Sequence, residues 1–118
     1  MKYQSIRSYS EADVERAIEN DSTADLAQMV VSVSMSGEDI RWAESLCVRL
    51  ARHNDRNVRG NAVLGFGHIA RMHGKLVSSD AISLVTRALT DEDSYVRGQA
   101  ISAADDIEQF LGVQIERQ

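Results

Sequence analysis

One short run of the sequence has the spacing of a phosphate-binding loop. Gly65-Phe66-Gly67-His68-Ile69-Ala70 fits the pattern G-x-G-x-x-A, in which the glycine backbone cradles the pyrophosphate of a dinucleotide. That chemistry needs a strand directly before the run and a helix that begins within it. Apolar residues on both sides recur at helical spacing instead, so the run falls in the middle of an expected helix. We therefore predict that its small residues allow close helix packing and that no cofactor is bound.

The three histidines, His53, His68 and His73, are the residues best suited to hold a metal ion. No two of them are four residues apart, which is the spacing that places two ligands on one helical face. A zinc site needs three or four ligands. The single cysteine, Cys47, lies in an apolar helical stripe, and we interpret it as a small core residue. The sequence therefore predicts no metal site.

Asp105, Asp106 and Glu108 are close enough in sequence to serve as paired carboxylates for acid–base chemistry or for a divalent cation. Consecutive residues on a helix point in different directions, so Asp105 and Asp106 do not converge on one atom. No set of serine, histidine and aspartate has the local signature of a nucleophile. We interpret the three acids as a solvated or partner-facing surface, and we expect no catalytic residues and no enzyme activity.

Composition and charge narrow the class of protein. The chain has 118 residues, of which 43% are hydrophobic and 5% aromatic, and it contains no proline, which favours one domain of closely packed helices over a sheet. The net charge is −5. Residues 38–78 hold seven bases and four acids, whereas residues 79–118 hold three bases and eight acids. The acidic C-terminal third disfavours nucleic acid as a direct ligand and favours a protein partner with a basic surface.

The sequence predicts no membrane segment. Residues 1–10 are polar and lack the apolar run of a signal peptide. No stretch reaches the roughly 18 apolar residues that span a bilayer. With one cysteine, no internal disulfide can form. We expect a cytoplasmic protein.

A repeat with a period of 38 residues organises most of the chain. Asp55 to Val63 aligns with Asp93 to Ile101, and six of these positions match by identity or by exchange between apolar residues. Each unit, 38–78 and 79–112, has the apolar spacing of two helices joined by a turn. For the first unit we expect a capping signal at Ser36–Asp39 and a helix end at Gly74. For the second unit we expect a cap at Ser79 and a helix end near Gly112.

Apolar residues at helical spacing define the inward face of each expected helix. In the first unit they are Ile40, Ala43, Cys47 and Leu50, and then Val58, Ala62, Phe66, Ile69 and Met72. In the second unit they are Ile82, Val85 and Leu89, and then Val96, Ala100, Ala103, Ile107 and Leu111.

Residues 1–37 show helical periodicity without the repeated motif. The apolar residues Val14, Ala17 and Ile18 indicate one helix, and Leu26, Met29, Val30 and Val33 indicate a second, with Ser22 or Thr23 as its cap. The β-branched run Val30–Val33 would also suit a strand. We favour the helix, because a helical solenoid needs about three stacked units and its terminal units commonly diverge.

The second helix of each unit resembles the signature of HEAT and HEAT-like repeats, Asp-x-x-Val-Arg-x-x-Ala. The first copy begins Asp55-Arg56-Asn57-Val58-Arg59-Gly60-Asn61-Ala62, and the second, from Asp93, has Ala104 and Asp105 where the pattern has a large apolar residue and glycine. The resemblance covers residues 38–112. It implies an all-α fold, a short right-handed α-solenoid of about three antiparallel helix pairs in a single domain, with 1–37 as capping helices and 113–118 as a tail.

The same resemblance implies structural roles for four charged residues. Asp55 and Asp93 would each cap a second helix, where a carboxylate accepts free backbone N–H groups and favours the positive end of the helix dipole. Arg59 and Arg97 would each reach toward an aspartate of a neighbouring unit.

The second helices of successive units line one face of a solenoid, so their residues outside the apolar stripe are candidates for contact with a partner. Leu64 is an apolar residue among polar ones, which suits an anchor. The surface passes from neutral and basic to acidic along its length. The candidate partner-binding residues are Asn61, Leu64, His68, Arg71, Gln99, Ser102, Asp105, Asp106, Glu108 and Gln109.

The most specific interpretation is a non-catalytic protein-binding module of the immunity-protein type. A short, acidic, helical, bacterial-looking protein resembles, in size and charge, the immunity proteins that bind and neutralise antibacterial toxins, many of which are basic nucleases. The alternative is a general HEAT-repeat scaffold or adaptor for other proteins. A HEAT-like DNA glycosylase is less favoured, because such enzymes have a basic concave face and this face becomes acidic.

Overall fold

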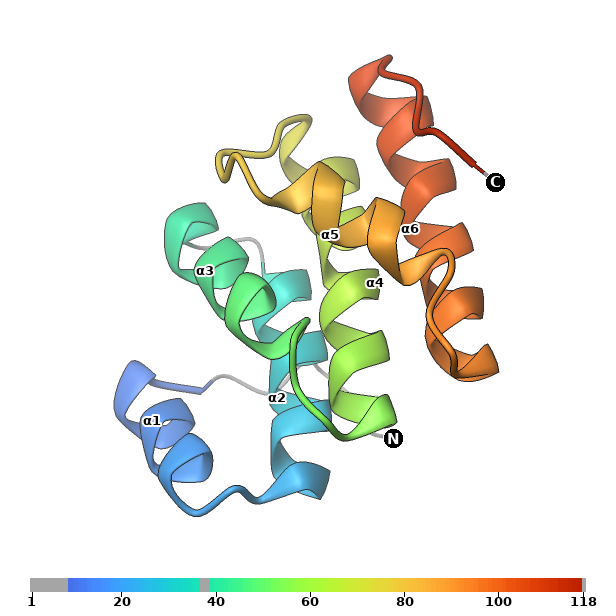
Figure 1. The fold of residues 1–118 in the computed structure, drawn as a ribbon. Coiled ribbons are helices and arrows are strands. Elements are labelled where there is room, and N and C mark those ends of the chain that lie inside the picture. Colours follow the sequence, from blue (N-terminus) through green and yellow to red (C-terminus); the bar gives the residue numbers. More distant parts are fainter. Residues whose placement is uncertain (1–8, 37–38, 118) are drawn as a thin grey trace, which may run out of the picture.

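The computed structural model describes residues 9–36 and 39–117, and this part of the chain forms six helices and no strand. The helices are α1 (Glu11–Glu19), α2 (Thr23–Ser36), α3 (Ile40–Leu50), α4 (Arg56–His73), α5 (Ala81–Ala88) and α6 (Ser94–Leu111). They form three antiparallel pairs (Figure 1). The run Val30–Val33, for which a strand was the alternative, lies inside α2. The all-α repeat fold predicted from the sequence is confirmed.

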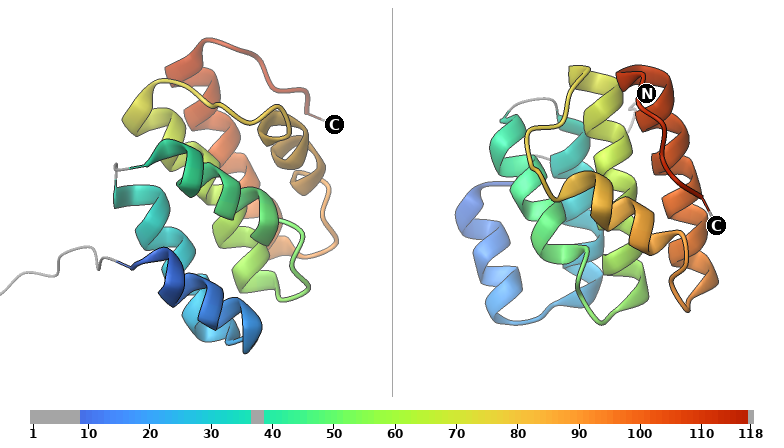
Figure 2. Two further views of the ribbon diagram at one scale, coloured as in Figure 1. Left: turned by 90° about the vertical axis from the view of Figure 1, so that its left-hand side faces the viewer. Right: turned by 45° about the horizontal axis from the view of Figure 1, so that its top comes forward.

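The helices lie in two layers (Figures 1 and 2). One layer contains α1, α3 and α5, and the other contains α2, α4 and α6 side by side. Fully buried side chains such as Val30, Phe66, Ile69 and Ile107 fill the space between the layers. Because α4 packs against α2 and α6 within its layer and against α3 and α5 across it, α4 is the central helix. None of the helices in the described ranges is long and apolar enough to cross a membrane.

Capping groups fix the ends of the second helices. The Asp55 carboxylate accepts the backbone N–H of the third residue of α4 at 3.0 Å, and the Asp93 carboxylate accepts that of Tyr95 at 2.8 Å. Both caps are as expected from the HEAT resemblance. The two helices end at Gly74 and Gly112, whose φ angles of 68° and 72° are left-handed values that glycine adopts without strain.

The start of α3 differs in part from the sequence expectation. Its cap is Asp39, whose carboxylate accepts the N–H groups of Arg41 at 3.0 Å and Trp42 at 3.2 Å. Ser36, the other end of the expected signal, is the last residue of α2, and its hydroxyl donates to the Val33 carbonyl instead. Gly37 and Glu38 lie outside the described residues.

The start of α5 is held from another helix. The prediction of Ser79 as its cap was wrong: the N-cap residue is Asp80, whose side chain makes no capping hydrogen bond in the described structure. The preceding loop is bound instead by Glu44 of α3, which accepts the N–H groups of Val77 at 2.7 Å and Ser78 at 2.6 Å. Glu44 is fully buried. This contact between distant parts of the chain fixes the loop, so a local cap is not required.

Two residues expected in the core lie on the surface. Met72 is 47% exposed and Ile82 is 36% exposed. Met72 follows Ile69 by three residues, a step that turns a side chain about 60° away from the preceding one. Ile82 lies next to the stripe that α5 buries, which consists of Ala81, Leu84, Val85 and Ala88. In α4 the expected stripe is buried from Val58 to Ile69, and only its last member is exposed. In α5 the buried stripe begins one residue earlier than expected, at Ala81.

Candidate functional site

Arg59 joins the two repeat units. Its guanidinium donates two hydrogen bonds of 2.9 Å to the Asp91 carboxylate in the next unit and further bonds to the carbonyls of His53 and Asn54. Hydrogen bonding from Arg59 lowers the pKa of Asp91. Arg97 donates instead to the backbone carbonyl of Asp91 in its own unit, at 2.7 Å, so the expectation that it reaches toward an aspartate of a neighbouring unit was wrong. The expected bridging role of Arg59 is therefore present, with Asp91 as the partner that the sequence did not identify.

A polar network connects α2, α4 and α6 on the face formed by the second helices. The Asn61 side-chain amide donates to the Ala27 carbonyl of α2 at 3.1 Å. Its carbonyl oxygen accepts the Tyr95 hydroxyl at 2.6 Å and the Gln99 amide at 3.3 Å. Gln99 also donates to the Tyr95 hydroxyl at 3.0 Å. These bonds hold three polar side chains in fixed positions across three helices.

A charged cluster lies further along the same two helices. Arg71 of α4 donates to the Asp106 carboxylate of α6 at 3.3 Å and to Nδ1 of His68 at 3.1 Å. Burial lowers the pKa of His68, and the nearby Arg71 guanidinium lowers it further against the opposing effect of Asp106. His68 is therefore a neutral acceptor near pH 7. Gly67 permits the close approach of α4 and α6 at this cluster, since a Cβ on Gly67 would lie 2.9 Å from the Ala103 Cα.

Eight of the ten candidate partner-binding residues lie along the face shared by α4 and α6. The two networks contain five of them, and the remaining three, Leu64, Ser102 and Gln109, lie three or four residues from network members on the same helices. Leu64 is half-buried, whereas Ser102 and Gln109 are exposed. We refer to these eight residues as the α4–α6 surface: Asn61, Leu64, His68, Arg71, Gln99, Ser102, Asp106 and Gln109.

The other two candidates, Asp105 and Glu108, lie on the outer edge of α6 and contact the C-terminal tail. Arg117 donates to Asp105 at 2.9 Å and to Glu108 at 2.7 Å, and Glu108 also accepts the N–H of Ile115 at 2.9 Å. Ile115 is only 2% exposed. The acidic pair thus holds residues 113–117 against α6, away from the α4–α6 surface.

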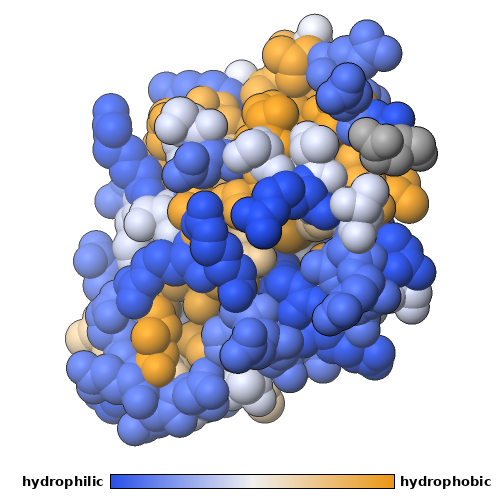
Figure 3. Space-filling view, viewed as in Figure 1, coloured by the Kyte–Doolittle hydropathy of each residue, from blue (hydrophilic) through white to orange (hydrophobic). Residues whose placement is uncertain are grey.

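Sequence reasoning missed two features of this region. Tyr95 was not a candidate, although it occupies the repeat position of Asn57 and is the aromatic residue nearest the Asp93 cap. Exposed apolar residues were also missed: Phe110, Val113 and Val77 are each at least 40% exposed. Figure 3 shows hydrophobic side chains gathered at the top of an otherwise largely hydrophilic face, over the end of α6 and the loop after α4. Their spacing alone did not distinguish them from core residues.

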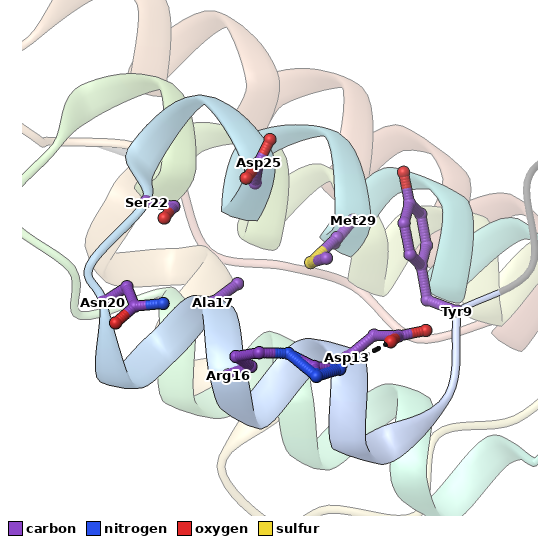
Figure 4. A pocket seen from close by; sticks show the side chains of 8 residues that line it. All are labelled: Tyr9, Asp13, Arg16, Ala17, Asn20, Ser22, Asp25 and Met29. Carbon is purple, nitrogen blue, oxygen red and sulfur yellow. Dashed lines mark hydrogen bonds and ion pairs between the residues drawn. The ribbon is translucent and has the colours of Figure 1, made fainter.

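A separate hollow of about 340 Å³ lies between α1 and α2 (Figure 4). Asp13 and Arg16 on its wall form an ion pair of 3.0 Å, and Asp13 also completes the cap of α1 with Ser10. These charges are therefore already used within α1. Among residues 9–36 and 39–117, no three His, Cys, Asp or Glu side chains are grouped closely enough to hold a metal ion.

A family model for HEAT repeats matches residues 43–110, which is more than half of the chain. The chain belongs to the HEAT-repeat family. Its HEAT fold is similar to a chain in the crystal structure of a CDI complex from Cupriavidus taiwanensis LMG 19424, with a TM-score of 0.75 and 23% sequence identity. The similarity covers 93% of this chain and 97% of that chain. A comparison with curated protein sequences gave no significant match.

Proposed function

We propose that this HEAT-repeat protein is a non-catalytic binding module, and specifically an immunity protein that binds and neutralises a cognate bacterial toxin domain. The observation that carries the proposal is the fold neighbour from a CDI complex, because the similarity extends over 97% of that chain. HEAT repeats present an extended helical face, which suits contact with a protein. The family match alone is equally compatible with a scaffold or adaptor, and the CDI neighbour favours the immunity role.

The α4–α6 surface is the region that we assign to the partner. Asn61, Gln99 and Tyr95 are held by hydrogen bonds, so little side-chain entropy is lost when a partner binds them. Exposed Phe110 and Met72 occupy equivalent positions in the two units and border this surface with apolar area. The partner that we propose is a protein with a basic surface, since residues 79–118, which include α6, carry a net charge of −5. On the α4–α6 surface itself, the one carboxylate, Asp106, is paired with Arg71.

Co-expression with a toxin tests this function. We expect a gene next to this one to encode a large secreted protein, and the C-terminal domain of that protein is the toxin to be used. With this domain, we expect the chain to restore growth and to bind the purified domain in calorimetry. Ser102→Arg with Gln109→Arg adds two positive charges to exposed positions of the surface and should weaken binding by about tenfold or more.

The control for this experiment places the same charge elsewhere. Ala12→Arg with Ser45→Arg changes exposed positions on α1 and α3, in the other layer, and should leave both binding and protection intact. The immunity role is wrong if the gene has no such neighbour, or if the domain encoded there neither binds the chain nor is neutralised by it. Equal loss of binding in the two double variants would contradict the assignment of the surface.

A further inference from the structure

A second hollow, of about 410 Å³, lies between the C-terminal ends of α3 and α5. These two helices are neighbours in the front layer of Figure 1, on the opposite side of the core from the layer that carries the α4–α6 surface. Three buried apolar residues, Ala51, Leu84 and Ala88, form part of its wall. The other residues that line it are Arg52, Arg59, Arg87 and Asp91.

The charges around this hollow do not balance. Asp91 is the single acid of the lining, and its carboxylate is occupied by Arg59 and by the N–H of Asp93 at 2.9 Å. Arg52 makes one hydrogen bond, to the Val48 carbonyl at 3.3 Å, and Arg87 makes no side-chain hydrogen bond or ion pair with the described residues. Two positive charges therefore face the hollow without a carboxylate partner in the part of the chain that the structure describes.

Most other arginines of the chain are paired. Within the described ranges, Arg16, Arg49, Arg56, Arg59, Arg71 and Arg117 each form an ion pair with a carboxylate. Basic residues near helix C-termini also complement the helix dipole, and this explains either Arg52 or Arg87 taken singly. It does not explain why both lie on one hollow with an apolar wall. Oxyanions are the groups that guanidinium forks bind most strongly, through paired, charge-assisted hydrogen bonds.

We propose that this hollow is a binding site for a doubly charged oxyanion, held between the guanidinium groups of Arg52 and Arg87. The Arg59–Asp91 pair forms a neutral, rigid side of the site, because each of its charges is satisfied by the other. Phosphate groups and paired carboxylates both carry two negative charges on oxygen atoms that accept hydrogen bonds from guanidinium groups. The site is independent of the proposed partner surface, since the two share no residue.

Titration with two small anions tests the site and identifies its ligand. Amide NMR spectra of the whole chain are recorded with inorganic phosphate and, separately, with succinate, at pH 7.5 and at constant ionic strength set with sodium chloride. We expect saturable shifts confined to residues 51–54 and 84–92. Stronger binding of phosphate identifies a phosphate-bearing ligand, and stronger binding of succinate identifies an acidic protein segment.

Matched variants decide whether the two arginines are responsible. Arg52→Gln with Arg87→Gln should weaken anion binding by about tenfold or more. Arg41→Gln with Lys75→Gln removes the same charge from exposed positions outside the hollow and should leave binding unchanged. Thermal unfolding of both variants establishes that the fold is retained. The proposal is overturned if neither anion produces saturable shifts, or if the two double variants lose binding equally.

Discussion

Glu44 is the one charged residue that is fully buried in the described structure. Its carboxylate lies in α3 without access to solvent, and it is stabilised by the two N–H groups of the loop before α5, at 2.7 and 2.6 Å. The sequence contains a signal for this role that we did not use. Glu44 lies on the apolar stripe between Ile40 and Cys47, where a solvated glutamate is not expected.

Glu44→Gln should lower the free energy of unfolding by about 1–3 kcal/mol. The amide that replaces one carboxylate oxygen presents N–H groups to a backbone N–H, so one buried donor loses its acceptor. Urea denaturation at pH 7 measures the change. Glu19→Gln is the control, because Glu19 is exposed at the end of α1, and its effect should stay within about 0.5 kcal/mol. A result for Glu44→Gln as small as that of the control would show that the loop is not held by this carboxylate.

The Arg59–Asp91 pair predicts a pH dependence of stability. The Asp91 pKa is lowered from its ordinary value of 3.8, mainly by hydrogen bonding from Arg59. Because the folded pKa is below the unfolded one, this stabilisation is fully present above that ordinary value and is lost as the pH falls through the folded pKa. We therefore expect Asp91→Asn to be about 2 kcal/mol less stable than the wild type at pH 7.

The difference in the free energy of unfolding between the wild type and Asp91→Asn should shrink as the pH falls from 5 to 2. Urea unfolding across this range measures it, and a difference that stays constant would contradict the role of Asp91 ionisation. Exposed pairs such as Arg49–Glu15 should contribute far less, since solvent screens them.

At the scale of helices, glycine decides how closely α4 and α6 approach. A methyl group on Gly67 would meet the backbone of Ala103 at 2.9 Å, and a backbone atom cannot rotate away. Gly98, within α6, has no atom within 4 Å of the same position. Gly67 is therefore required by close helix packing, whereas at Gly98 packing leaves room for a side chain.

Gly67→Ala should lower the free energy of unfolding by about 1–3 kcal/mol, because the two helices must separate. Gly98→Ala should raise it by up to about 1 kcal/mol, since alanine is the better helix former and nothing obstructs its methyl group. Thermal or urea unfolding of both variants provides the comparison. Destabilisation by Gly98→Ala, or a neutral Gly67→Ala, would show that the spacing of α4 and α6 is not set as described.

Helices were the part of the structure that the sequence predicted best, and the reason is physical. Apolar periodicity and the 38-residue offset reflect local geometry that repeats, so they identified the helix pairs. The Asp55 and Asp93 caps followed from the resemblance to HEAT repeats. Errors arose where distant contacts replace local signals. Ser79 is not a cap, and Glu44 of α3 holds the adjacent loop instead. Met72 is exposed at the end of α4, beyond the buried part of its stripe.

Charge is distributed differently in the whole molecule than along the chain. The C-terminal third is acidic in sequence, yet arginines reach its carboxylates: Arg59 and Arg71 of the preceding unit bind Asp91 and Asp106. Arg117 of the tail binds Asp105 and Glu108. Composition alone could not show these pairings, since they depend on which helices lie side by side. The acidic surface predicted from the sequence is therefore partly neutralised, and its role in binding a partner remains a prediction.

The tail completes the core on the outer edge of α6, and its contribution can be separated from that of the helices. Ile115 is 2% exposed, and its N–H donates to Glu108, whereas Val113 in the same segment is 42% exposed. Ile115→Ala should lower the free energy of unfolding by about 2–4 kcal/mol, because a buried side chain is removed and a cavity is left. Val113→Ala should change it by about 0.5 kcal/mol or less.

Hydrogen exchange at the amide of residue 115 distinguishes local detachment of the tail from global loss of stability. If the tail is bound as described, this amide is protected in the wild type and in Val113→Ala but exchanges rapidly in Ile115→Ala, while amides in the centre of α4 stay protected. Rapid exchange at this position in the wild type would mean that the tail does not pack on α6. Asp105 and Glu108 would then be unpaired and available to a basic partner, which would restore the acidic contact surface expected from the sequence.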